Sequence, residues 1–165
     1  MVRLTLLQVF LIWVAGFGTV SILARRKVAT LASEVRLPCV VKYYIIATPI
    51  ILLEESLTLE VPYFWGIIPI LAAFYVLFLP LYVIQRVTRC SFVFASLLFG
   101  AMGCFNEFIL VGRIRSLDGP VLLIMCPLCF LIYAVMAIMP SYYLQVSRKP
   151  YLAIPKSRNH WLARS

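Results

Sequence analysis

Two sets of residues in this sequence have the types and spacing to do chemistry. The first is the pair Cys126 and Cys129 in the segment CPLC. A C-x-x-C pair lowers the pKa of a thiol and supports thiol–disulfide exchange. The second set consists of acidic and amide side chains inside or beside apolar runs: Glu54, Glu55, Asn106, Glu107 and Asp118. Because a charge within a membrane span is costly, such residues are candidates for binding an ion, a proton or a partner helix.

The carboxylates allow more than one interpretation. Glu107 could have one of those roles, or it could stay hydrated near the membrane surface, or pair with Arg113 or Arg115. A hard cation such as calcium could also be held by oxygen ligands from Glu54, Glu55, Glu60 and Asp118. No loop has the spacing of a dedicated calcium site, so we expect no resident metal. Asn106 and Glu107 are expected to hydrogen-bond across helices, either fixing the packing or docking a partner.

The segment CPLC, followed by FLIYA, resembles the redox motif of the vitamin K epoxide reductases. This resemblance implies a membrane thiol oxidoreductase in which Cys126 and Cys129 are the catalytic pair. That enzyme class also needs a cysteine pair after its first helix, where this chain has only Cys39. The alternative is that these cysteines are small apolar side chains in an apolar chain.

Other catalytic chemistry lacks the residues it needs. The only histidine is His160, and the sequence contains neither a phosphate-binding glycine loop nor a G-x-S-x-G motif. The sequence therefore favours a non-enzymatic protein without a cofactor, and the thiol pair is its enzymatic alternative.

The elements that position these residues are apolar helices. The chain is 64% hydrophobic and 13% charged, against about 45–50% and about 25% in soluble domains. A helix needs about 20 apolar residues to cross a bilayer, and the candidate runs are 4–24, 37–53, 61–85, 90–112 and 120–146. They predict an all-α membrane bundle over residues 1–146 and a basic tail at 147–165. Prolines within the runs predict kinks, and small residues at 95, 96, 100 and 103 predict a closely packed helix face.

The span count depends on the run at 37–53, which contains Lys42 and Pro49. With five spans and the N-terminus outside, 12 of the 15 cations lie on the cytosolic side, and only Arg3, Arg113 and Arg115 lie outside. With four spans the division is 8 to 7. The positive-inside rule therefore favours five spans and a cytosolic C-terminus. Five of the six acids then lie toward the outer side.

The net charge of +9 reflects this topology and does not indicate a nucleic-acid partner. Cations near a membrane surface gain about 1 kcal/mol each from anionic lipid. The tail offers five such contacts: Arg148, Lys149, Lys156, Arg158 and Arg164. The alternative is an unstructured tail without a specific role.

Two segments offset by 58 residues repeat a pattern. LEVPYFWGIIP (59–69) and LDGPVLLIMCP (117–127) both read Leu, acid, any residue, Pro, and then a second Pro after six residues. Each follows an apolar run that contains glutamate near its end. The repeated unit is thus a helix, a glutamate, an acidic outer loop and a helix entered through proline.

These units resemble the fragile-X-F-associated transmembrane protein family over about residues 45–145. The matching residues of the second unit are Phe105, Glu107, Leu117, Asp118, Gly119, Pro127 and Leu128. Those of the first are Glu55, Glu60, Trp65 and Pro69. The resemblance implies a multi-pass protein of the endoplasmic reticulum or related membranes, without defined catalytic residues and with a calcium-handling role in one branch.

The sequence thus favours a small endomembrane protein whose partners are the lipid bilayer and another membrane protein or a second copy. It would act by helix–helix association or in ion (calcium) homeostasis. A thiol oxidoreductase and an accessory subunit of a larger membrane complex are the alternatives.

Overall fold

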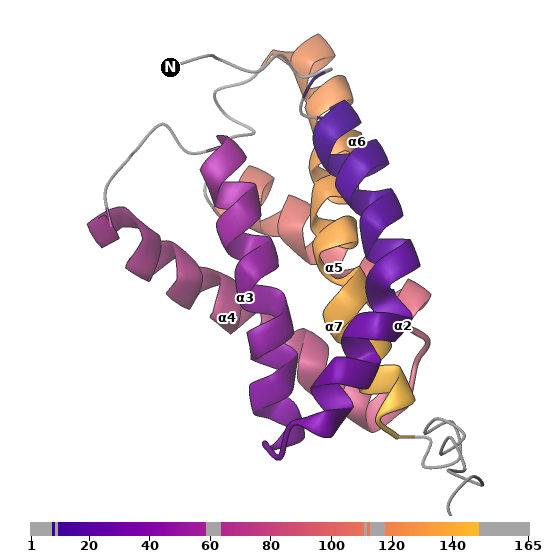
Figure 1. The fold of residues 1–165 in the computed structure, drawn as a ribbon. Helices are drawn as coiled ribbons and strands as arrows, with labels where there is room; N and C mark the ends of the chain where they lie inside the picture. The colour runs from indigo at the N-terminus through magenta and orange to yellow at the C-terminus, as the bar shows by residue number, and fades with distance from the viewer. Residues whose placement is uncertain (1–7, 9, 59–63, 111, 113–117, 149–165) are drawn as a thin grey trace, which may run out of the picture.

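The computed structural model describes residues 8, 10–58, 64–110, 112 and 118–148, and the regular structure in these ranges is helical (Figure 1). Within these ranges, two π-helices, η1 and η2, accompany six α-helices. In chain order they are η1 (Phe10–Phe17), α2 (Gly18–Glu34), α3 (Cys39–Thr58), α4 (Phe64–Thr88), α5 (Phe92–Phe105), η2 (Asn106–Leu110), α6 (Gly119–Met136) and α7 (Ile138–Val146).

These elements join into longer rods. Helix η1 continues into α2, α5 continues into η2, and a single residue, Ala137, separates α6 from α7. The rods follow the apolar runs expected from the sequence, with shifted ends. The first run was expected to end at residue 24, but α2 continues through Arg25 to Glu34, because charge ends an apolar run without ending a helix. Helix α3 begins directly after Pro38, whose carbonyl accepts the Lys42 N–H.

The break at Ala137 has a local cause. Pro140 lacks an N–H, and its ring would clash with the carbonyl four residues earlier. That residue is Met136, where α6 ends. The kink expected at Pro140 is therefore present, whereas α4 continues across Pro69 and Pro80 and α6 across Pro127.

Three of the described helical segments are long and apolar enough to cross a membrane: Ile68–Thr88, Phe92–Leu110 and Gly119–Val146. These segments are consistent with an integral membrane protein. The other two rods carry charges within their length, Arg25, Arg26 and Lys27 in α2 and Lys42, Glu54 and Glu55 in α3.

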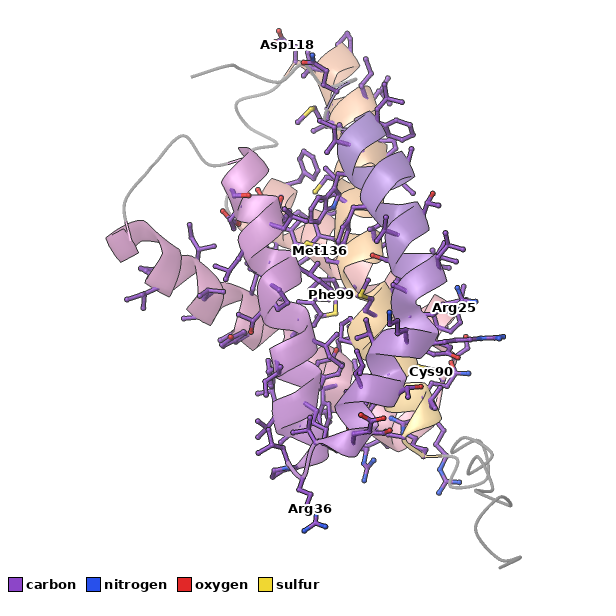
Figure 2. The ribbon with its side chains drawn as sticks, in the orientation of Figure 1. Arg25, Arg36, Cys90, Phe99, Asp118 and Met136 are labelled. Carbon is purple, nitrogen blue, oxygen red and sulfur yellow. The ribbon has the colours of Figure 1, made fainter. Side chains whose placement is uncertain are left out.

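Successive rods run in alternating directions (Figure 1), so charged residues collect at the two ends of the bundle. We call the end where α2 stops and α3 starts the basic end; it carries Arg36, Arg86, Arg89 and Arg148, together with Glu34. We call the opposite end the acidic end; it carries Glu54, Glu55, Glu107 and Asp118. Figure 2 shows Arg36 and Asp118 at these opposite ends.

Aromatic side chains fill the core between the rods. Phe78 of α4 stacks on Phe99 of α5, with ring centroids 4.2 Å apart, and the Trp13 indole donates to the carbonyl of Ile132 at 3.3 Å. Helix α6 packs mainly on α5, and α7 packs along α2. In Figure 1 the N-terminal half of α4 leans away from the bundle. The outer surface is apolar, and Leu123 is 78% exposed, as expected for side chains that face lipid.

Candidate functional site

Helices α5 and α6 meet through two glycines. A Cβ at Gly100 would lie 2.7 Å from the carbonyl oxygen of Phe130, and one at Gly103 would fall within the ring of Tyr133. Ala95 and Ser96 of the same helix are also buried. The small-residue face expected from the sequence is therefore used inside the bundle, where it lets α6 approach the α5 backbone.

Glu107 lies on the same side of this rod as Gly103, four residues farther along. The Tyr133 hydroxyl donates to Glu107 Oε1 at 2.9 Å, and the Tyr133 ring is buried. Glu54, which is buried on α3, lies within electrostatic range of Tyr133. We call Glu54, Glu107 and Tyr133 the carboxylate–tyrosine site. It explains why a glutamate is kept in this apolar run, since Glu107 connects α5 and η2 to α6.

Asn106 behaves differently from its neighbour. Its backbone N–H bonds to the carbonyls of Gly103 and Met102, but within the described part of the chain its carboxamide makes no hydrogen bond. The side chain is half-buried, and the adjacent Phe105 and Leu110 are 53% and 67% exposed. The half-buried amide of Asn106 is thus close in sequence to exposed apolar side chains.

The remaining expected acids do not join a metal site. Glu55 is half-buried beside Glu54, and Asp118 is exposed just before α6. Among the residues that the structure describes, no group of three or more His, Cys, Asp or Glu side chains could hold a metal ion. The calcium cluster considered from the sequence is not assembled by Glu54, Glu55 and Asp118, and Glu60 lies outside the described residues.

Cys126 and Cys129 lie one turn apart on α6, and a third thiol joins them. Cys104 of α5 donates from its Sγ to the Cys126 carbonyl at 3.3 Å and interacts with the Cys129 thiol. All three cysteines are reduced. Cys39 instead lies at the basic end, with its Sγ 3.6 Å from Ser147 Oγ. The structure thus does not bring Cys39 beside the CPLC pair, as the reductase resemblance would need.

No model of a known protein family, no curated protein and no solved structure matches this chain. The resemblance to the fragile-X-F-associated transmembrane proteins therefore stays a prediction from sequence. Function has to be inferred from geometry, in which Tyr133 joins two helices through Glu107 and the neighbouring Asn106 is half-buried.

One residue of the carboxylate–tyrosine site and one of the thiol group were missed from sequence. Tyr133 lies in the segment FLIYA, and Cys104 lies between Gly103 and Phe105. Each lies about one helical turn from a candidate site residue. Tyr133 is four residues after Cys129, and Cys104 is three residues before Glu107. This helical spacing was the available signal.

Of the five tail cations expected to contact lipid, the structure describes only Arg148, at the basic end. The others, Lys149, Lys156, Arg158 and Arg164, lie outside the described residues. Burial, followed by the charge of nearby Arg86, lowers the pKa of Arg148 below its usual value.

Proposed function

We propose that the protein is a five-span protein of the endoplasmic reticulum or a related membrane that acts without catalysis, by binding a helix of a partner membrane protein. The charge distribution supports the topology. A bundle with Arg36, Arg86, Arg89 and Arg148 at one end and all of its described acids except Glu34 at the other matches the positive-inside rule when the basic end faces the cytosol. An odd number of crossings would then leave the two chain termini on opposite sides.

The position of Arg25 supports a membrane crossing by the first rod, formed by η1 and α2. Its guanidinium lies 5.5 Å from the ring centroid of Phe92 and 5.4 Å from that of Tyr142. These rings belong to the start of α5 and to α7, close to the basic end. Cation–π contacts of this kind stabilise a guanidinium at the level where an apolar core meets water. The apolar part of this rod, up to residue 24, would then lie within the bilayer.

The observation that carries the partner-binding role is the contrast between Asn106 and Glu107. Glu107 accepts a hydrogen bond from Tyr133 of its own bundle, whereas the Asn106 carboxamide is bonded to none of the described residues. In an apolar medium an amide gains about 1 kcal/mol by bonding to another helix. A partner helix that packs on Phe105 and Leu110 could supply that bond.

Site-specific photocrosslinking in native membranes tests this role. A photoreactive side chain at Leu110, about one turn after Asn106, should crosslink to one discrete protein. The matched control is Leu23, which is 76% exposed on α2 and should crosslink to lipid only. Asn106→Leu should abolish the protein adduct at Leu110, and Asn106→Gln should retain it. A product of twice the chain mass would identify a second copy as the partner. Lipid adducts alone at both positions would overturn the proposal.

A thiol oxidoreductase is the second candidate, and the position of Cys104 favours it. Three thiols on two touching helices could pass a disulfide between them. In such a reaction Cys126 and Cys129 would form an S–S bond and lose two electrons and two protons to an external disulfide, which would become two thiols. A calcium role has less support, because the described carboxylates form no metal-binding group.

A further inference from the structure

Three arginines converge at the basic end. Arg86 lies in the last turn of α4, Arg89 follows α4, and Arg148 follows α7. The charges of Arg86 and Arg89 both act on Arg148 and, together with burial, lower its pKa. Like charges held this close repel one another unless an anion compensates them. Glu34 is the acid at this end, but it is exposed and is not among the groups that act most on Arg148.

The Arg148 guanidinium has unused donors. Its Nε and Nη2 atoms are buried and have no hydrogen-bond acceptor in the described part of the chain. These two nitrogens form one edge of the planar guanidinium, the edge that binds carboxylate or phosphate through two parallel hydrogen bonds. A buried donor without an acceptor is costly, so this edge is suited to an anion with paired oxygens.

The start of α3 adds to the positive potential. Cys39, its first residue, lies close enough to interact with Arg148, and its thiol contacts Ser147. The N-terminus of a helix carries a partial positive charge and free N–H groups. The Tyr82 hydroxyl lies in the same group, within range of Cys39, Arg86 and Arg148. These donors come from α3, α4 and the end of α7, so folding assembles them.

The surroundings indicate where the anion comes from. The arginines flank the ends of the three described segments that are long and apolar enough to cross a membrane, at Thr88, Phe92 and Val146. This is the level at which lipid phosphates lie. Val87, between Arg86 and Arg89, is 74% exposed, and Val83 one turn earlier is also exposed, so acyl chains could pack beside the site. Figure 2 shows nitrogen-tipped side chains gathered at this end, near Cys90 and Arg36.

We propose that Arg86, Arg89 and Arg148 bind the phosphate group of an anionic phospholipid at the basic end of the bundle. The site is distinct from general attraction between a basic tail and the membrane, because the donors of Arg148 are buried and the start of α3 and the end of α4 lie within electrostatic range of it. It rests on the position of the arginines at the ends of the three described segments that are long and apolar enough to cross a membrane, and it is independent of the partner proposed for Asn106.

Native mass spectrometry of the full chain, purified in detergent, tests the site with phosphatidic acid and phosphatidylcholine as probes. We expect one retained phosphatidic acid. Its affinity should fall about tenfold or more in Arg86→Gln/Arg148→Gln, since two charged donors are lost. The control Arg26→Gln/Lys27→Gln removes the same charge from exposed positions of α2 and should change the affinity less than twofold. Arg148→Lys keeps the charge but loses the paired donors, and should weaken binding by an intermediate factor.

Three outcomes would overturn the proposal. Equal losses in the double variant and the α2 control would indicate net charge alone. Equal retention of phosphatidylcholine would remove the preference for an anion. Displacement by inorganic phosphate or glycerol 3-phosphate at the concentration of the lipid would indicate a soluble phosphate ester instead. If the double variant does not fold, Arg148→Lys and the competition measurement still decide.

Discussion

The ring of Tyr133 lies against the bare backbone of Gly103, so the two helices that carry them touch at this point. The same side chain reaches Glu107 with its hydroxyl. Tyr133 thus packs on Gly103 and hydrogen-bonds to Glu107, both on the facing rod. Steric fit and hydrogen bonding at this contact should be separable by mutation.

Gly103→Ala should destabilise the protein by about 1–3 kcal/mol, because the added methyl group would overlap the Tyr133 ring and force α6 away. Thermal unfolding in detergent measures this effect. Gly119→Ala is the matched control, since a Cβ there meets nothing within 4 Å. Equal stability of the two variants would contradict the close approach of α5 and α6.

Glu107→Gln should be almost neutral, because the amide oxygen can still accept the Tyr133 hydroxyl. Glu107→Leu should cost about 1 kcal/mol, the usual value of one hydrogen bond between membrane helices. Tyr133→Phe should cost a similar amount, and the double variant Glu107→Leu/Tyr133→Phe should cost little more than either single change. Additive losses would show that the two side chains act separately. A loss of stability in Glu107→Gln would mean that charge matters more than the bond.

Mild oxidation should join Cys104 to the CPLC pair, because the three thiols lie together. The experiment uses a variant in which Cys39 and Cys90 are serine. Cyanogen bromide cleaves after Met102, Met125 and Met136, so Cys104 is released in fragment 103–125 and the CPLC pair in fragment 126–136. A disulfide between these fragments is the expected product. Free Cys104 together with free Cys126 and Cys129 after oxidation would contradict the thiol arrangement.

Single cysteines at positions 36 and 118, in a chain without other cysteines, should react with a membrane-impermeant thiol reagent from opposite faces of sealed vesicles. Arg36 and Asp118 are both exposed and lie at opposite ends of the bundle. Position 36 should react from the cytosolic face under the proposed topology. Reaction of both from one face would exclude five spans in the proposed order.

The sequence predicts the helices better than it predicts their contacts. The apolar runs locate the rods, and Pro140 predicts the break at Ala137. Glu107 was expected to bond across helices, and it does. Its partner Tyr133 could not be chosen from sequence, because helices that are apolar on every side have no stripe to identify the packed face. Cys104 was missed for the same reason, since its role depends on the register of α5 against α6.

The division of the last rod at Ala137 affects the order in which the protein can be assembled. Helix α6 packs on α5, made shortly before it, whereas α7 packs along α2, near the other end of the chain. Synthesis delivers α2 early and α7 late. The α2–α7 contact therefore cannot form until the other described helices have been made, and until then α2 lacks its principal neighbour.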